Sequence, residues 1–473
     1  MSEVPQGSRF KILVENSGKM IINENKIEDI LRRTNNPSAK TARAVLKKAR
    51  QKQGLSLEEA GSLVNLADPE LVKELFKTAG WIKDQIYGER LVLFAPLYIS
   101  DFCVNDCAYC NFHKSNSGFE RRKLTLGEIG QQARFIINMG HKRILLECGE
   151  DPDNNTIDYV VKAIKKIYSV KTDKGNIRRV NVNIAATTVK DYRRLKDAGI
   201  GTYQLFQETY HRPTYEKIHQ GPKSDYDRQI TAYDRAFKAG IDDLGLGALF
   251  GLYDWRFETL ALIGHARYLD RKYKVGPHTI SVPRFQEAPT VGFRPPYPVS
   301  DSDFLKLIAI LRLAVPYTGM IISTRETPKI RRAAFMIGIS QASAASNTAT
   351  GGYGKRRGQP QFEIQDDRRL EELIGDVLKD GFLPSFCTAC YRRGRTGEAF
   401  MSLSKPGEIH KFCRPNGLLT FAEYLRDFAN NGFHNKGEAL IKIYLDKIED
   451  ETLRNETNRC LNEIREGKRD LYF

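Results

Sequence analysis

The sequence predicts an α/β fold: a (βα)8 barrel of the TIM type, preceded by helices and followed by a helical C-terminal domain. Eight short β-rich runs alternate with amphipathic helical segments from about residue 90, and the strand pattern ends near residue 350. Such alternation is the signature of a parallel barrel. The 473 residues also suffice for a large barrel with additional domains. We therefore expect domains at residues 1–90, 91–350 and 351–473.

The individual elements follow from local signals. Residues 1–90 are expected to be helical, because Ser56 and Glu59 form a capping box and Asp68 caps a helix that starts with Pro69. Thr125 opens a further capping box within the barrel. The predicted strands are 92–99, 143–149, 179–185, 202–209, 242–251, 279–285, 319–326 and 337–345. The loops after the C-terminal ends of such strands form the active site of a barrel.

Composition and charge exclude several classes of protein. No run of eighteen apolar residues is present, and the N-terminus lacks the apolar segment of a signal peptide. We therefore expect a cytoplasmic protein without a membrane partner. The net charge of +16 raises nucleic acid as a partner, but Lys and Arg are spread along the chain and no nucleic-acid-binding signature accompanies them. We expect no nucleic-acid partner.

Six of the eight cysteines form two trios, with Cys148 and Cys460 outside them. The trio spaced C-x3-C-x2-C follows the first predicted strand and consists of Cys103, Cys107 and Cys110. The trio spaced C-x2-C-x22-C lies in the C-terminal domain and consists of Cys387, Cys390 and Cys413. In a cytoplasmic protein such clustering favours metal ligation over disulfides. Three thiolates can hold three irons of a [4Fe–4S] cube and leave the fourth iron open. Zinc, with His113 or His410 as the fourth ligand, is the alternative.

The first trio resembles the motif of the radical S-adenosylmethionine (SAM) superfamily. The resemblance rests on the spacing C-x3-C-x-aromatic-C at the end of the first barrel strand, with Tyr109 at the aromatic position. It implies that the open iron binds the amino and carboxylate groups of SAM. It also implies that an electron from the cluster cleaves SAM and releases a 5′-deoxyadenosyl radical.

Two further segments resemble SAM-binding motifs of this superfamily. "LECGEDP" (146–152) resembles the G-G-E motif, in which Gly149 and Glu150 match and Cys148 replaces the first glycine. "QETYHRPTYEKIH" (207–219) resembles a segment of the biotin synthase and tyrosine lyase branches. Its Glu208 and Arg212 are predicted either to contact SAM or to form a structural ion pair.

The second trio resembles the HydG family of [FeFe]-hydrogenase maturases. Within the tyrosine-cleaving branch of radical SAM enzymes, C-x2-C-x22-C in a C-terminal domain is typical of that family, and the resemblance covers nearly the whole chain. The tyrosine lyase of thiamine thiazole biosynthesis, 2-iminoacetate synthase, shares the barrel but lacks the C-terminal cluster. It is the alternative interpretation.

The resemblance implies a radical SAM carbon–carbon lyase with two [4Fe–4S] clusters and an additional labile iron. The resemblance also implies that L-tyrosine is cleaved between Cα and Cβ to p-cresol and dehydroglycine, and that dehydroglycine becomes CO and cyanide at the second cluster. The implied product is an iron–carbonyl–cyanide unit for the H-cluster of the hydrogenase. The implied partners are a low-potential electron donor, such as a ferredoxin, and other hydrogenase maturation proteins.

Three residues outside these motifs are candidates for substrate or iron binding. "STRET" (323–327) supplies Arg325 as a bidentate fork for the tyrosine carboxylate, with Ser323 as a neighbouring donor. His265 lies toward the C-terminal end of the helix after the fifth strand, which is at the bottom of a barrel. If the C-terminal domain docks there, His265 reaches the additional iron, and the resemblance implies a histidine in that role. An arginine without a substrate role and an interface histidine are the alternatives.

Overall fold

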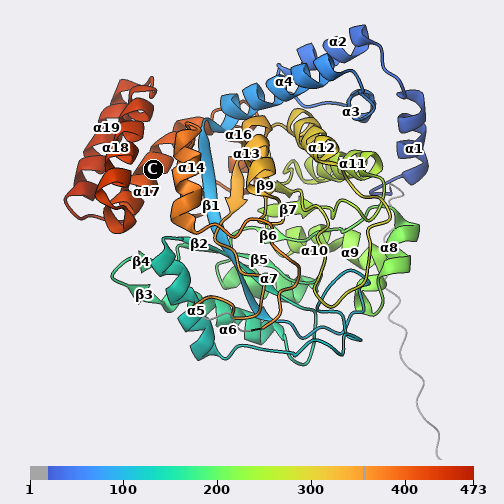
Figure 1. Ribbon diagram of the computed structural model, residues 1–473, viewed down its shortest axis with the longest axis horizontal. Coiled ribbons are helices and arrows are strands. Elements are labelled where there is room, and N and C mark those ends of the chain that lie inside the picture. The colour runs from blue at the N-terminus through green and yellow to red at the C-terminus, as the bar shows by residue number, and fades with distance from the viewer. Residues whose placement is uncertain (1–19, 355–357) are drawn as a thin grey trace, which may run out of the picture.

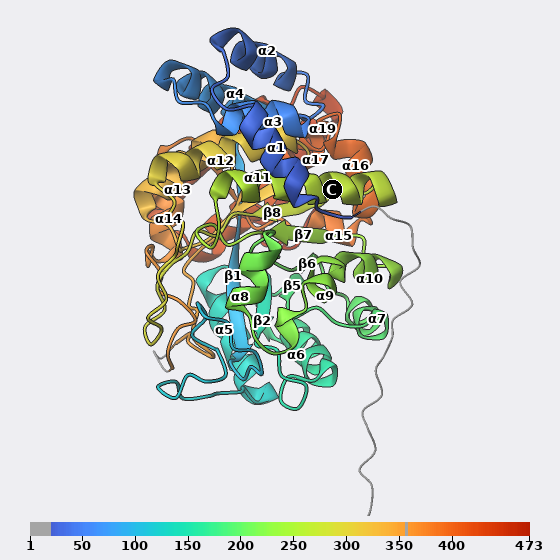
Figure 2. The same cartoon turned by 90° about the vertical axis from the view of Figure 1, so that its right-hand side faces the viewer.

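The computed structural model describes residues 20–354 and 358–473. Its first helices lie together along the top of the molecule in both ribbon views (Figures 1 and 2). They are α1 (Glu24–Arg33), α2 (Ala39–Ala49), α3 (Leu57–Val64) and α4 (Pro69–Tyr87). The predicted caps are present, since Ser56 and Glu59 close a capping box at α3 and Asp68 accepts backbone hydrogen bonds at the start of α4. The helical prediction is therefore confirmed for the described part of residues 1–90.

Eight parallel strands close into the predicted barrel. They are β1 (Arg90–Ser100), β2 (Arg143–Cys148), β5 (Arg179–Asn183), β6 (Tyr203–Gln204), β7 (Leu244–Gly247), β8 (Thr279–Ser281), β9 (Gly319–Ile322) and β10 (Gln341–Ser343). Their order in the sheet is their order in the chain, and β10 pairs with β1 through Val92 and Gln341. Every predicted strand overlaps one of these eight, so the fold class is confirmed.

Helices cover the outside of the barrel. They are α5 (Leu126–Met139), α6 (Ile157–Ser169), α7 (Val189–Asp197), α8 (Arg212–Ile218), α9 (Tyr226–Ile230), α10 (Ala232–Lys238), α11 (Trp255–Tyr273), α12 (Asp301–Ala314) and α13 (Pro328–Ile337), with the 3-10 turn η1 (Pro222–Ser224). A short hairpin, β3 (Lys171–Thr172) with β4 (Gly175–Asn176), follows α6. Thr125 caps α5 with Glu128, as predicted.

The chain after the barrel is helical, with one exception. Its elements are α14 (Leu370–Lys379), β11 (Leu383–Ser385), α15 (Ala389–Arg392), α16 (Gly397–Ser404), α17 (His410–Phe428), α18 (Asn431–Asp446) and α19 (Glu451–Arg465). The sequence predicts no strand here, and β11 corrects that prediction. It runs parallel to the first residues of β1, with Leu383 opposite Arg90 and Ser385 opposite Val92. At three residues including a proline it gives no recognisable strand pattern.

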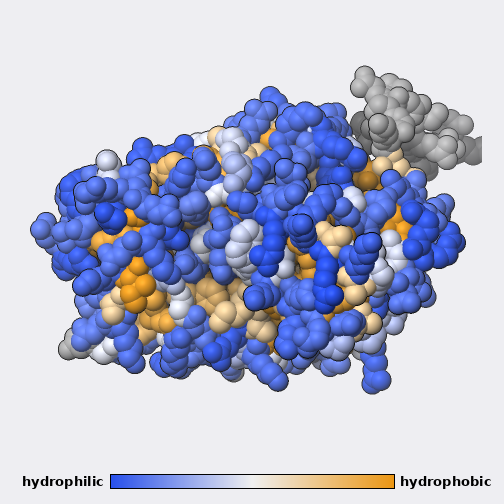
Figure 3. Space-filling model, turned by 90° about the horizontal axis from the view of Figure 1, so that it is seen from above, coloured by the Kyte–Doolittle hydropathy of each residue, from blue (hydrophilic) through white to orange (hydrophobic). Residues whose placement is uncertain are grey.

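One hydrophobic cluster joins all of these parts. It runs from Ile22, before α1, through the barrel strands to Ile464 in α19. The C-terminal helices therefore share a core with the barrel, while the predicted domain boundaries remain a prediction. None of the described helices is long and apolar enough to cross a membrane. The face drawn in Figure 3 is mostly hydrophilic, with small apolar areas scattered over it.

Candidate active site and metal centres

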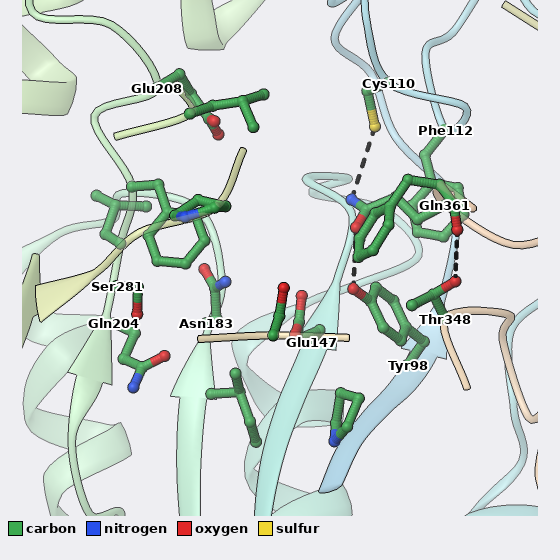
Figure 4. A pocket seen from close by; sticks show the side chains of 18 of the residues that line it. Tyr98, Cys110, Phe112, Glu147, Asn183, Gln204, Glu208, Ser281, Thr348 and Gln361 are labelled. Atoms are coloured by element: carbon green, nitrogen blue, oxygen red, sulfur yellow. Dashed lines mark hydrogen bonds between the residues drawn. The ribbon is translucent and has the colours of Figure 1, made fainter. Parts of the chain in front are cut away.

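A cavity of about 210 Å³ lies where the barrel strands end. Figure 4 shows that its wall carries polar side chains from several strands, with the carboxylate of Glu147 at the centre. Tyr98 comes from β1, Glu147 from β2, Asn183 from β5, Gln204 from β6 and Ser281 from β8. This cavity, called the first cavity below, lies at the C-terminal ends of the strands, where barrel enzymes have their active sites.

The first cysteine trio lines this cavity. Cys103, Cys107 and Cys110 lie on the loop after β1, and all three are among the lining residues. The loop is held from both sides, since Val104 N donates to the Glu150 carbonyl (2.7 Å) and Ala108 N donates to the Ile218 carbonyl (3.0 Å). Burial raises the pKa of Cys107 well above its usual value and that of Cys110 to about 11. A metal must therefore displace protons when it binds these thiols.

Four of the five predicted SAM-binding residues line the same cavity: Tyr109, Gly149, Glu150 and Glu208. Gly149 lies against the cysteine loop, where a Cβ atom would overlap the Phe102 carbonyl oxygen. Glu150 accepts a hydrogen bond from Asn105 Nδ2 (2.7 Å), next to the cysteines, and pairs with Arg228. The structure thus brings the strand β2 motif and the cysteine loop together.

Arg212 does not line the first cavity, which corrects its predicted contact with SAM. Its guanidinium pairs with Asp227 (2.6 Å) and lies over the Tyr226 ring, with 39% of the side chain exposed. The structural ion pair, which was the alternative, is what the structure shows.

Glu208 and Lys223 form an ion pair inside the cavity (2.7 Å between Nζ and Oε1). Burial alone lowers the pKa of Lys223, but the Glu208 carboxylate and neighbouring groups outweigh it and raise this pKa well above its usual value. Glu208 adopts a left-handed backbone conformation (φ 68°), which places its side chain on the cavity side of the strand end. Lys223 lies in η1 and carried no sequence signal.

Ser323 and Arg325 follow β9 and also line the first cavity. The Arg325 guanidinium lies 3.3 Å from the centre of the Phe362 ring, which covers one of its faces. Burial lowers the pKa of Arg325. The structure therefore brings both predicted substrate-binding residues to the cavity that contains the cysteine trio.

A second, smaller cavity of about 30 Å³ is lined by the other trio: Cys387, Cys390 and Cys413. Cys387 comes two residues after β11, Cys390 lies in α15 and Cys413 in α17. Burial raises the pKa of Cys390 to about 12 and also raises that of Cys413. Arg143 donates to the Cys387 carbonyl (2.7 Å), so the barrel wall holds this loop.

The second cavity lies at the bottom of the barrel. Arg90, Arg143 and Gln341, which line it, are the first residues of β1, β2 and β10, and His278 directly precedes β8. Parallel strands start at the same end of a barrel, opposite the first cavity. The second trio and the strand starts therefore enclose one site.

The structure places His278, rather than His265, at the second cavity. His265 is buried within α11, where its Nδ1 lies 3.0 Å from the Tyr210 hydroxyl and its ring packs against Tyr233. The prediction that His265 reaches the second trio is therefore wrong, because that face of α11 packs inside the molecule. His278 stacks on Phe400, and its Nδ1 lies 2.8 Å from Asp243 Oδ2. These two contacts hold the His278 imidazole in the wall of the second cavity.

The fit of these sites to iron–sulfur clusters rests on their donor sets. Each cavity is lined by three cysteine sulfurs. In the described part of the chain, no three His, Cys, Asp or Glu side chains are grouped so that they could hold one metal ion. His113 and His410 line neither cavity, and the Nδ1 atom of each lies within hydrogen-bond distance of a nearby backbone carbonyl. Neither histidine supplies the fourth ligand that the zinc alternative needs.

Sequence reasoning missed Glu147, Lys223 and His278. His278 had an available signal: residues just before a predicted strand lie at the bottom of a barrel, and "GPH" precedes the sixth strand. Glu147 directly precedes Cys148, the first position of the recognised motif, and strand alternation could have placed it. Lys223 had none, because its position depends on the fold of the segment around η1.

Comparison with known proteins agrees with this geometry. Residues 97–262 match the family model of the radical SAM superfamily, and residues 281–383 match that of the biotin and thiamin synthesis associated domain. The 2-iminoacetate synthase of Escherichia coli K12 is 29% identical over 360 residues, which cover 76% of this chain and 92% of that protein. The radical SAM match implies SAM and a [4Fe–4S] cluster as cofactors.

Two crystal structures match over almost the full length. A structure of HydG, a maturase of the [FeFe]-hydrogenase, is 52% identical with a TM-score of 0.93, covering 96% of this chain and all of that one. HydG from Carboxydothermus hydrogenoformans is 40% identical with a TM-score of 0.82, covering 93% of this chain and 97% of that one. The chain therefore belongs to the HydG family of [FeFe]-hydrogenase maturases and is a radical SAM enzyme.

Proposed function

We propose that this protein cleaves L-tyrosine between Cα and Cβ and builds an iron–carbonyl–cyanide unit for the hydrogenase H-cluster. The products of the first step are p-cresol and dehydroglycine, and dehydroglycine is converted to CO and cyanide at the second site. The observation that carries this proposal is the presence of two cysteine-lined cavities at opposite ends of one barrel. A barrel that only cleaved tyrosine would need the first cavity alone.

In the first cavity, Cys103, Cys107 and Cys110 would hold the cluster and leave one iron for SAM. When bound, the cluster and SAM supply a 5′-deoxyadenosyl radical. Tyr109, Gly149, Glu150 and Glu208 line the space beside the trio and would hold SAM. Because Glu150 is tied to Asn105, the SAM site keeps a fixed position relative to the cysteine loop.

The substrate would bind deeper in the same cavity, with its carboxylate on Arg325. The ring of Phe362 fixes the plane of the guanidinium, whose N–H groups then present a bidentate fork. Ser323 stands beside it. With SAM and substrate bound, the surrounding barrel wall would shield a reactive radical from side reactions.

In the second cavity, Cys387, Cys390 and Cys413 would hold the second cluster. His278 would bind the additional iron, which is cargo rather than a resident cofactor. Stacking on Phe400, with the Asp243 carboxylate close to Nδ1, would keep the His278 ring in the cavity wall. A low-potential donor, such as a ferredoxin, would reduce the first cluster, and other maturation proteins would receive the product.

The second candidate is 2-iminoacetate synthase for thiamine biosynthesis, which the Escherichia coli relative favours. That function would use a single cluster and would release dehydroglycine. The second trio, enclosed with strand-start residues in its own cavity, favours the maturase function instead.

Anaerobic reconstitution with iron and sulfide tests the proposal. We expect about eight irons per chain from two clusters, with the additional iron above this. Incubation with SAM, L-tyrosine and a reductant should then yield p-cresol, CO and cyanide. About four irons with p-cresol and no CO would indicate the thiamine enzyme. Colourless protein with bound zinc would overturn both functions.

A further inference from the structure

The first cavity contains two charged side chains of opposite sign that form no ion pair within the described part of the chain. Glu147 is the next-to-last residue of β2, and Arg325 follows β9. Both line the cavity. Within residues 20–354 and 358–473, neither takes part in an ion pair, whereas the other cavity carboxylates, Glu150 and Glu208, are each paired with a cation.

The polar group next to Glu147 is already engaged. The Tyr98 hydroxyl donates to Gln361 Oε1 (2.9 Å), and Figure 4 shows the Glu147 carboxylate pointing into the open space between Tyr98 and Asn183. Phe362 covers a face of the Arg325 guanidinium but offers it no hydrogen-bond acceptor. Both side chains therefore present free hydrogen-bonding edges to the cavity.

Such an arrangement is costly unless a ligand completes it. Burial raises the pKa of Glu147 to about 7, although the Tyr98 hydroxyl and the charge of Arg325 pull it down. Burial also lowers the pKa of Arg325. Each shift reflects a buried charge that its neighbours compensate only in part, and burial therefore opposes ionisation. A ligand with one positive and one negative group would compensate both charges at once.

We propose that Glu147 determines specificity for the substrate by pairing with the α-ammonium group of an amino acid whose carboxylate is on Arg325. This inference rests on the proposed function and deepens it. The cavity then selects a zwitterion, rather than a carboxylic acid or an amine alone. The pairing with Glu147 also places the amino group of the substrate against β2. Gly149, which directly follows β2, lies beside the cysteine loop.

The test compares three ligands that share the 4-hydroxyphenyl group and differ in the charged groups they carry: L-tyrosine, tyramine without the carboxylate, and 3-(4-hydroxyphenyl)propanoate without the amino group. Affinities are measured by equilibrium dialysis on the reconstituted protein with SAM and without reductant, so that no turnover occurs. Glu147→Gln should lower the affinity for L-tyrosine and for tyramine by about 10- to 100-fold, as expected for the loss of a charged hydrogen bond. The affinity for the propanoate should not fall.

Three further measurements sharpen the result. Glu147→Asp should recover part of the lost affinity for L-tyrosine, because the charge is restored one methylene shorter. Glu120→Gln, which removes an exposed carboxylate, should change none of the three affinities. SAM affinity should be unchanged in Glu147→Gln, which also shows that the variant is folded.

Three results for Glu147→Gln would each overturn the inference: an equal loss of affinity for all three ligands, an unchanged affinity for L-tyrosine, or a loss of affinity for SAM alone. These outcomes are separate from failure of the proposed function. If the wild-type protein forms p-cresol while Glu147→Gln binds L-tyrosine normally, only the role of Glu147 is wrong. If the fully reconstituted wild-type protein neither binds nor cleaves L-tyrosine, the proposed function itself is wrong.

Discussion

The two cysteine sites are built alike and enclosed differently. Each trio begins two or three residues after a parallel strand, since Cys103 follows β1 and Cys387 follows β11. The first cavity, of about 210 Å³, contains the free charged groups Glu147 and Arg325. The second, of about 30 Å³, is walled by the strand starts and by α15 and α17. The same local arrangement thus gives one site open to small molecules and one with little space beyond its cysteines.

The comparison predicts that the two trios have separable functions, and the largest effect comes from the first. Cys107→Ser should abolish p-cresol, CO and cyanide together, because all chemistry starts at the first cavity. It should lower the iron content of the reconstituted protein by about four per chain. Product analysis and iron determination check this. Residual p-cresol above a no-SAM control would contradict it.

Cys390→Ser should break only the second site. We expect p-cresol formation to continue, while CO and cyanide are lost, because the fragment has no cluster on which to react. The measurement is p-cresol by chromatography alongside CO trapped by a haem protein. CO at the wild-type level would show that the second trio is not needed.

His278→Ala should have a narrower effect than removal of either trio. Both clusters should remain and p-cresol should form, but the signal of the additional iron in EPR spectra should disappear. His265→Gln is the matched control, because His265 lies inside α11 and away from the second cavity. If the control loses the signal and His278→Ala keeps it, our correction is wrong.

Gly149→Ala tests the contact between strand β2 and the cysteine loop. The added methyl group would overlap the Phe102 carbonyl, which forces the loop away. Such overpacking costs roughly 1–3 kcal/mol. We expect weaker SAM binding in titrations, while the second site is unaffected. If Gly149→Ala binds SAM as tightly as the wild-type protein does, the cysteine loop can move to accommodate the methyl group without loss of SAM binding.

Arg212→Ala should have the smallest effect. Its exposed ion pair with Asp227 is worth less than about 1 kcal/mol, and it lies outside the first cavity. Thermal unfolding should shift slightly, and SAM affinity should stay the same. A marked loss of SAM binding would restore the original prediction for this residue.

Sequence patterns were sufficient to predict the barrel, but they did not identify every residue of its two sites. The alternation of strands and helices located all eight strands, because buried parallel strands and amphipathic helices leave strong periodic signals. Predicted strand ends were too long: residues 202–209 were expected to be extended, but β6 ends at Gln204. Glu208 then turns into the cavity through a left-handed conformation that periodicity does not reveal.

The choice between two histidines shows a further limit. The sequence positions of both His265 and His278 are compatible with the bottom of the barrel, but only His278 lines the second cavity. Which face of α11 is buried depends on tertiary packing against Tyr210 and Tyr233. By contrast, spacing in the sequence was enough to assign each cysteine to its trio. The first trio lies on one short loop, and the second lies on a loop and two packed helices.

The pairing of β11 with the start of β1 has a geometric consequence. Because Ser385 lies opposite Val92, β11 ends eight residues before the end of β1, which is about 26 Å along the strand. The second trio begins two residues after β11, at Cys387. β1 is therefore a rigid spacer between the two cysteine sites. Surface loops can change length without effect on this spacing. An insertion in β1 would change the distance between the two cysteine sites and the register of the strand with its neighbours.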